Sequence, residues 1–245
     1  MAKTRSSGEI TQRALREAAI RLIAQDGYHG VSLRTLAEEV GIQAASLYNH
    51  IENKQQFLFD LLRAIMEDLV EEVQAEVAQT EGTLAKVCVF VANHVSFHAR
   101  RQLEVYIGTM ELRSLLPEHR AVQLRLREEH EMLLQALIDQ GEAEGLFRVP
   151  DRRVVTFAIL SMTTTLANWY REDGRLSVQD LQRLYIELAL RMLDAKPTMQ
   201  DLLAIGERVS AMNNPKVAQA DEVQEERDKA APRAKAPRKL GRRRA

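Results

Sequence analysis

The most informative part of this chain spans residues 41–54 and reads GIQAASLYNHIENK. An amphipathic segment at residues 33–40 leads into it, and Gly41 suits the positive-φ turn that ends such a helix. A second short helix is expected directly afterwards. Apolar side chains shared by the two helices would hold them together: Leu36, Ala37, Val40, Ile42 and Leu47. The pattern predicts a helix-turn-helix, whose second helix can lie in a DNA major groove.

The residues before this stretch complete a three-helix unit. Apolar residues between Ile10 and Ile23 recur at three- and four-residue spacing, which predicts one face of a helix that Gly27 ends. Ser32 is a candidate N-cap for the next helix, because its hydroxyl can accept an otherwise unpaired backbone N–H. Lys3 and Arg5 lie in a polar leading segment and can reach a phosphate backbone.

A long helix is expected from Lys54 onward, joined to the first unit without a linker, so that movement can pass between the two parts. Gly82 ends it. Further helices are expected at residues 83–101, 102–115 with a kink near Gly108, 117–141, 151–171, 177–193 and 198–212. The two at 151–171 and 177–193 are apolar on more than one face, so each is buried in a core or packed against another subunit. We favour a four-helix bundle between two copies.

Composition restricts the class of protein. The chain has 245 residues with 5% aromatics, which favours helix over sheet. Its net charge of −1 means that any nucleic-acid affinity comes from local patches. The single cysteine, Cys88, excludes a disulfide within the chain. No segment reaches the roughly 18 apolar residues of a membrane span, and the N-terminus lacks a secretion signal. We expect a cytoplasmic protein without a membrane partner.

Three runs of the sequence resemble the N-terminal domain of TetR-type transcriptional regulators: ALREAAIRLIAQDGY at 14–28, LAEEVGI at 36–42, and SLYNH at 46–50 followed by Lys54. Ile51 stands where that family usually has Phe. Gln43 stands where a small residue is common, and this second departure bears on operator choice. The resemblance implies an all-α fold with a helix-turn-helix DNA-binding domain at residues 1–54, a helical ligand-binding and dimerisation domain at 55–195, and a C-terminal extension at 196–245.

The resemblance also implies a function. The implied protein is a homodimer that represses transcription by occupying a palindromic operator and that releases the operator when a small ligand binds. Tyr48 and Lys54 match phosphate-contacting positions, and Ser32 and Arg34 lie where the second helix approaches the backbone. The residues on or near the exposed side of the recognition helix are Gln43, Ala44, Ser46, Asn49 and His50. Gln and Asn can read adenine, and an Ala methyl can meet a thymine methyl. The alternatives are a half-buried core aromatic for Tyr48 and a solvated helix end for Asn49 and His50.

A second resemblance covers shorter segments. Residues 93–105, 110–115 and 168–177 are similar to a subgroup of these regulators that senses acyl-coenzyme A thioesters from fatty-acid, branched-chain, aromatic or steroid degradation. Such a ligand needs an apolar tunnel with polar or cationic groups at its mouth. Candidates for the tunnel are Val91, Val95, Tyr106, Met110 and Phe157, and for the polar end His94, His98, Arg101, Arg113, Trp169 and Arg171. Alternatively, Arg101 and Arg113 pair with Glu104 or Glu111, and Trp169 is a core or dimer-contact residue.

Other function classes find less support. His94 and His98 have a spacing at which two imidazoles can share a metal, but no His-Glu-x-x-His, Gly-x-Ser-x-Gly, phosphate loop or dinucleotide fingerprint is present. We expect no catalytic residue, metal or cofactor. All charged residues from Lys229 to Arg244 are basic, which predicts a disordered tail that adds salt-sensitive DNA affinity or only solubility. This tail supports the alternative of an architectural DNA-binding protein.

Overall fold

The computed structural model describes residues 7–214 and their side chains from Thr11 onward. The predictions for Lys3, Arg5 and the basic tail lie outside the described residues. Within them the fold is all-α, as predicted, and no strand occurs. The helices are α1 (Ser7–Gly30), α2 (Leu33–Val40), α3 (Ala44–Leu47), α4 (Lys54–Ala78), α5 (Thr83–Arg100), α6 (Gln102–Met110), η1 (Glu111–Ser114), α7 (Pro117–Ala143), α8 (Arg152–Thr164), η2 (Thr165–Asn168), α9 (Val178–Met192) and α10 (Met199–Asn213).

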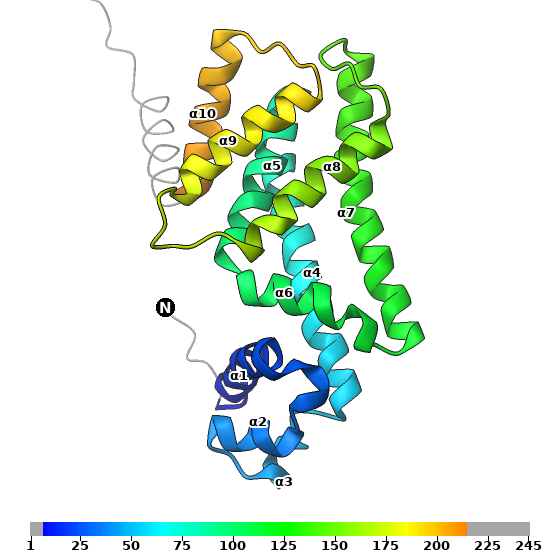
Figure 1. Cartoon of the computed structure of the whole chain (residues 1–245), viewed down its shortest axis with the longest axis vertical. Coiled ribbons are helices and arrows are strands. Elements are labelled where there is room, and N and C mark those ends of the chain that lie inside the picture. Colours follow the sequence, from blue (N-terminus) through cyan, green and yellow to red (C-terminus); the bar gives the residue numbers. More distant parts are fainter. Residues whose placement is uncertain (1–6, 215–245) are drawn as a thin grey trace, which may run out of the picture.

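The first three helices form a small unit at one end of the molecule (Figure 1). The α2 helix begins where the Ser32 hydroxyl accepts the Thr35 N–H at 3.0 Å, so the predicted N-cap is confirmed. It ends at Gly41, whose φ of 73° is the left-handed conformation that glycine tolerates best. In α1 the φ of 72° at Gly27 interrupts the helix, and a further helical turn continues to Gly30.

The α4 helix carries the chain from the small unit into the larger one without a linker (Figure 1). It starts where the Asn53 side chain accepts the Gln56 N–H at 2.8 Å. Along its length it packs against α5, α6 and α7. One continuous helix therefore belongs to both parts of the molecule.

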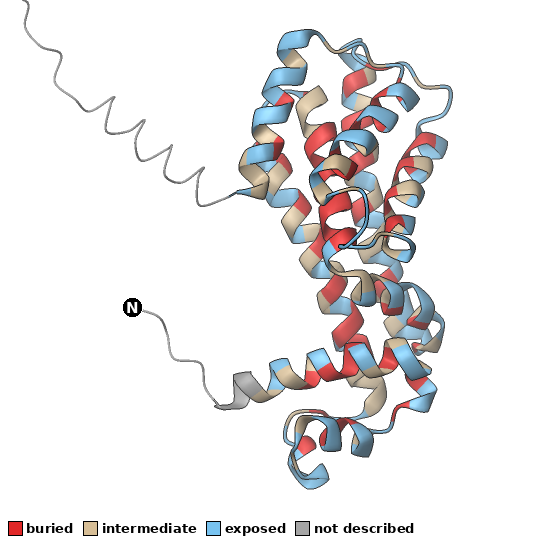
Figure 2. Ribbon diagram, turned by 60° about the vertical axis from the view of Figure 1, so that its left-hand side comes forward, coloured by how far each residue is buried: buried red, intermediate tan, exposed pale blue. Residues whose placement is uncertain are grey.

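The larger unit is built around α5, which contacts α4, α7, α8, α9 and α10. Residues 87–99 of this helix are all buried, so it has no solvent-facing side (Figure 2). A helix covered on every side forms the centre of a core. None of the helices in residues 7–214 is long and apolar enough to cross a membrane.

One predicted kink and one predicted helix boundary were wrong. The boundary expected between residues 101 and 102 is present at Arg101, whose φ of −118° and ψ of 40° end α5, but the kink expected near Gly108 is absent, since Gly108 lies within α6. The helix expected at 151–171 ends at Thr164 and gives way to the 3₁₀ turn η2. Hydroxyls near this end bond back to the helix: Thr163 donates to the Ile159 and Leu160 carbonyls. Such bonds compete with regular helix geometry.

Candidate nucleic-acid interface and ligand cavity

The α3 helix presents polar and small side chains on a firmly anchored support. Leu47 is completely buried in the small unit and fixes the helix. The predicted base-reading residues Gln43, Ala44, Ser46 and Asn49 are exposed, and His50 is half-buried. Tyr48 is 62% exposed, so it is not the half-buried core aromatic of the alternative interpretation. This surface has side chains available to a partner and a rigid base beneath them.

The predicted phosphate-contacting residues flank this helix. Arg34 is exposed, and its Nε lies 2.9 Å from the Glu38 carboxylate. The Lys54 Nζ lies 4.3 Å from the centroid of the Tyr28 ring, a cation–π contact at the start of α4. Burial lowers the pKa of Lys54, and the nearby Glu111 carboxylate opposes that shift. The Lys54 ammonium is therefore held in place at the junction between α1 and α4.

A cavity of about 170 Å³ lies inside the larger unit, between α4, α5, α6, α7 and α8. Its walls differ in character. The α4 wall is apolar and consists of Leu62, Ile65, Met66 and Leu69. The α5 and α7 walls bring polar side chains into the same space: His94, His98, Gln123, Arg127, His130 and Glu131. The cavity can receive a molecule that is apolar along one side and polar along the other.

The three histidines of the cavity form a stacked cluster. The ring centroids of His94 and His98 are 4.0 Å apart, and those of His94 and His130 are 5.2 Å apart. The His98 Nδ1 lies 2.7 Å from the His94 carbonyl oxygen and donates to it. Burial lowers the pKa of His98 and His130 to about 4 and that of His94 well below its usual range. All three imidazoles are therefore neutral at pH 7.

Several polar atoms of this cavity have no hydrogen-bond partner within the described part of the chain. They are the His94 Nδ1, both ring nitrogens of His130 and the Gln123 Nε2. The Arg127 guanidinium donates to the Gly108 carbonyl at 2.9 Å, and no described carboxylate pairs with it within 4.0 Å. No group of three or more His, Cys, Asp or Glu within residues 7–214 is arranged to hold a metal ion.

The residues that line the cavity differ from the ligand-binding residues predicted from the sequence. Of the predicted residues, His94 and His98 line the cavity. Tyr106 and Met110 are 43% and 42% exposed on α6, and Arg113, Trp169 and Arg171 are also exposed. The α7 residues Gln123, Arg127 and His130 were not expected in the site. Their spacing of four and three residues places them on one helix face, which was the available signal.

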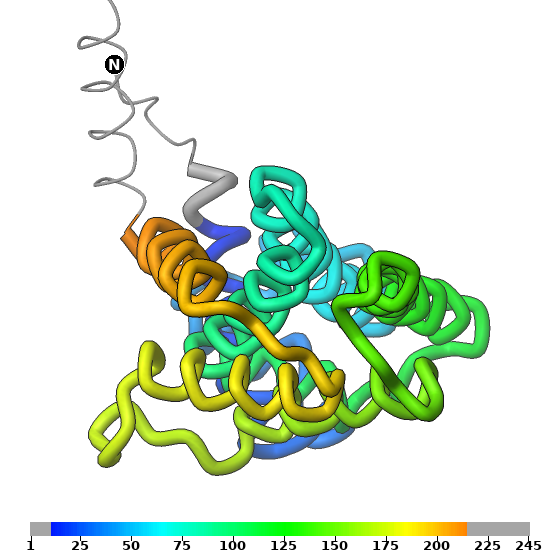
Figure 3. Tube along the Cα trace, turned by 90° about the horizontal axis from the view of Figure 1, so that it is seen from above, coloured from blue at the N-terminus to red at the C-terminus, as the bar shows by residue number. Residues whose placement is uncertain are grey.

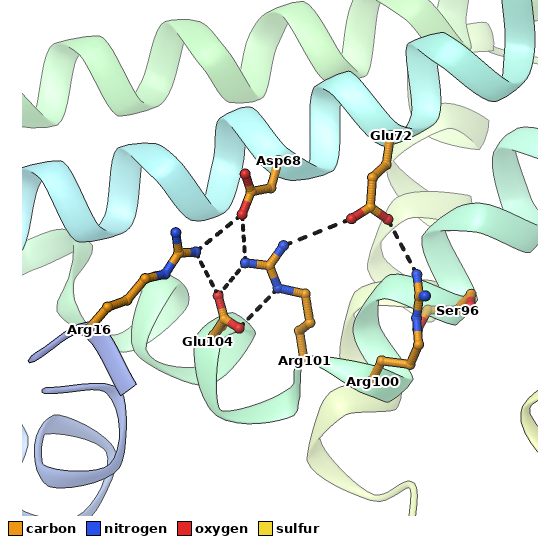
Figure 4. A network of polar contacts seen from close by, with 7 residues as sticks. All are labelled: Arg16, Asp68, Glu72, Ser96, Arg100, Arg101 and Glu104. Carbon is orange, nitrogen blue, oxygen red and sulfur yellow. Dashed lines mark hydrogen bonds and ion pairs between the residues drawn. The ribbon is translucent and has the colours of Figure 1, made fainter. Parts of the chain in front are cut away.

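Arg101 belongs to an ion cluster that links the two units (Figure 4). From α1, the Arg16 Nη2 lies 3.1 Å from both Asp68 on α4 and Glu104 on α6. Arg101 pairs with the same two carboxylates, as one alternative interpretation held for Glu104. Glu104 also lines the cavity. The Glu104 carboxylate therefore both lines the cavity and pairs with Arg16 of α1, a helix of the small unit.

Buried Glu111 makes a second connection between the units. Its carboxylate accepts the Tyr28 N–H of α1 at 3.1 Å and the Ser114 hydroxyl at 2.6 Å. The α1 helix is thus held to the α6–η1 segment at both Arg16 and Tyr28. A displacement of that segment would reach the small unit through these contacts.

Two protein-family models match the chain. Residues 15–61 match the bacterial regulatory proteins of the tetR family, and residues 80–193 match the tetracyclin repressor-like C-terminal domain. The first match covers the unit with the exposed α3 helix. The second covers α5 to α9 and hence most of the cavity.

Individual relatives agree with these matches. The transcriptional repressor KstR2 of Mycobacterium tuberculosis H37Rv is 27% identical over 192 residues, which cover 76% of this chain and 95% of the relative. The fatty acid metabolism regulator protein of Bacillus subtilis 168 is 24% identical over 179 residues, covering 70% and 90%. The crystal structure of AibR in complex with isovaleryl coenzyme A and operator DNA superposes with a TM-score of 0.67 at 27% identity, covering 76% of this chain and all of AibR.

Proposed function

We propose that this chain, which belongs to the TetR family of DNA-binding transcriptional regulators, is a cytoplasmic homodimeric repressor that releases a palindromic operator when a small ligand binds. Members of this family are transcription factors rather than enzymes. One observation carries the proposal. The α4 helix begins beside the exposed recognition helix and then forms the apolar wall of the cavity.

In this proposal, residues 1–54 bind DNA. The exposed side chains of α3 and its flanking turns read base edges in the major groove, and Tyr48, Lys54, Ser32 and Arg34 contact phosphates. The Ser32 hydroxyl accepts the Thr35 N–H and lies 2.7 Å from the Thr35 hydroxyl, so it can donate to a phosphate when the Thr35 hydroxyl is the donor between the two. Residues 55–195 bind the ligand and form the dimer.

The proposed dimer surface lies on α8 and α9. These helices lie on the same side of α5 (Figures 1 and 3), and both combine a buried face with exposed apolar residues. Those residues, with their exposed fractions, are Val154 63%, Phe157 40%, Leu184 44%, Leu188 46% and Met192 37%. A second copy would cover this apolar surface in a four-helix bundle.

The dimer is tested by changing one residue of that surface. Leu188→Glu should give a monomer at concentrations where the unchanged chain is a dimer, because a charge would be buried at the interface. Sedimentation velocity measures the state. Met132→Glu on α7 is the matched control, since Met132 is 61% exposed on a helix that is not part of the proposed surface. A monomeric unchanged chain, or a dimeric Leu188→Glu variant, would contradict the proposed surface.

For the ligand we propose an acyl-CoA thioester. The relative AibR was crystallised with isovaleryl coenzyme A, and two other relatives are named for repression or fatty acid metabolism. The cavity of about 170 Å³ is smaller than the ~300 Å³ typical of a complete ligand site. It therefore suits the acyl group, with the nucleotide part outside.

Ligand binding is coupled to DNA binding through α4 and α6. An acyl group between the α4 wall and the polar α7 wall would displace α4, whose first residue, Lys54, contacts Tyr28 of the small unit. It would also lie beside Glu104 and so disturb the Arg16 ion pairs. Both effects change the angle between the two recognition helices of a dimer, and operator spacing tolerates little change in that angle.

Thermal melting against a panel of acyl-CoAs, free acids and coenzyme A tests this function. A ligand that binds only the folded chain raises the melting temperature by mass action. A shift with an acyl-CoA that its free acid does not give supports the proposal, and no shift across the panel contradicts the acyl-CoA effector. Footprinting then separates the two DNA-binding functions. A discrete palindromic footprint supports a regulator, whereas sequence-blind coating supports an architectural protein.

A further inference from the structure

The unpaired polar atoms of the cavity are concentrated on one wall. Gln123 is 4% exposed, His130 4% and His94 2%, so all three side chains are buried. A buried polar atom without a partner costs about 1–3 kcal/mol. Native proteins contain few such atoms. Their concentration around one cavity indicates that a bound molecule supplies the missing partners.

The α7 helix arranges these groups in a row. Gln123, Arg127 and His130 follow one another at spacings of four and three residues, so they share one face that lines the cavity. His94 of α5 lies beside His130, with ring centroids 5.2 Å apart. Opposite them the α4 wall offers only apolar side chains. The polar groups thus form a continuous edge along one side of the space.

These groups mostly donate hydrogen bonds. The unpaired atom of Gln123 is the amide nitrogen, which is a donor only. Arg127 is a donor only, and its hydrogen bond to the Gly108 carbonyl leaves further N–H groups available. Neutral His130 has one donor nitrogen and one acceptor nitrogen, both unpaired. A molecule that satisfies this row must present oxygen acceptors to it.

Resting on the proposed acyl-CoA effector, we propose that the acyl group carries an oxygen substituent, a ketone, hydroxyl or carboxylate, within its buried part. Gln123 and Arg127 donate to that oxygen, and His130 accepts from or donates to it. The apolar α4 wall packs against the hydrocarbon on the other side. A plain alkyl chain would leave the row of donors dehydrated and unpaired, and the site would therefore select against it.

The test compares hexanoyl-CoA with derivatives that carry one added ketone, hydroxyl or terminal carboxylate, by calorimetric titration of the full-length chain. At least one oxygenated derivative should bind about tenfold or more tightly, as one satisfied buried donor implies. The neutral and charged derivatives show which oxygen group is read. Hexanoyl-CoA binding as tightly as every derivative would overturn the inference and leave the acyl-CoA effector intact. No binding by any member would overturn both.

Variants identify which wall of the cavity is responsible for the preference for an oxygenated acyl group. Gln123→Leu should keep its affinity for hexanoyl-CoA and lose most of the preference for the oxygenated derivative. Gln123 is buried, so its replacement can also disturb folding, and Arg127→Met therefore provides a second variant. Arg125→Met, at an exposed position on the same helix, is its matched control. Met66→Ala on the apolar wall should weaken both ligands equally. A preference that survives both Gln123→Leu and Arg127→Met would overturn the assignment of this row.

Discussion

The recognition helix and the cavity both present polar groups without protein partners, but they do so in opposite surroundings. Asn49 and Tyr48 are exposed, so water satisfies them until DNA replaces it. Gln123 and His130 are buried, so their unpaired atoms lower the stability of the folded chain. The comparison shows that a polar group without a hydrogen-bond partner is weak evidence of function on a surface and stronger evidence inside a cavity.

The same contrast separates binding from stability. A change on the exposed surface should alter DNA affinity and leave the fold intact, whereas a change beneath it or in the cavity should alter both. Four changes test this separation, beginning with the largest expected effect.

Leu47→Ala should lower the free energy of unfolding of the small unit by about 2–5 kcal/mol, because Leu47 is completely buried and a cavity would remain. Operator binding should fail with it. Urea denaturation followed by circular dichroism measures the loss. Leu203→Ala is the control, since Leu203 is 63% exposed on α10. Equal stability of the two variants would contradict the assignment of Leu47 as the anchor of α3.

Acidification should destabilise the larger unit through its histidines. The pKa of His98 and His130 is about 4 in the folded chain and about 6.5 in the unfolded chain. Their contribution to stability is therefore complete above pH ~6.5 and declines as the pH falls toward ~4, because only the unfolded chain binds the protons. The slope can reach ~1.4 kcal/mol per pH unit for each histidine.

Melting temperatures across that pH range measure the slope. His130→Leu should flatten it, because one titrating group is removed. Leu134→Val on the same helix should lower stability without changing the slope. An unchanged slope in His130→Leu would show that His130 is not held neutral by burial.

Tyr48→Ala should weaken operator binding by about tenfold, because one hydrogen bond to a charged phosphate is lost. The melting temperature should stay nearly constant, because Tyr48 is 62% exposed. Fluorescence anisotropy with a labelled operator measures the affinity. Tyr48→Phe removes only the hydroxyl and should reproduce most of the loss. An unchanged affinity in both variants would remove Tyr48 from the interface.

Sequence alone predicted the small unit better than the cavity, for a physical reason. The helix-turn-helix depends on local signals: the Ser32 cap, the positive φ at Gly41 and the burial of Leu47. The cavity depends on how distant helices pack. Nothing near residue 94 indicates that His130 will stack beside it. The exposure of Tyr106 follows from helix rotation, which apolar periodicity fixes poorly when most faces are apolar, and Trp169 is exposed in the turn after η2.

Arg16→Met should have the smallest effect on stability and a selective effect on regulation. Its ion pairs with Asp68 and Glu104 are partly solvated, so their loss costs no more than about 1 kcal/mol. The difference in operator affinity with and without ligand should shrink, because α1 is no longer tied to Glu104. Arg13→Met is the matched control, since Arg13 pairs with Glu17 on its own helix. Equal ligand responses in the two variants would contradict a coupling role for Arg16.

The most direct measurement is the affinity of the full-length chain for its operator, selected from random duplex DNA, with and without a saturating acyl-CoA that raises the melting temperature. If the α4 helix links the cavity to the recognition helices, the ligand should weaken operator binding by about 5–150-fold, the usual range for coupled sites. Operator DNA should weaken ligand binding by the same factor. An operator affinity unaffected by bound ligand would contradict the link.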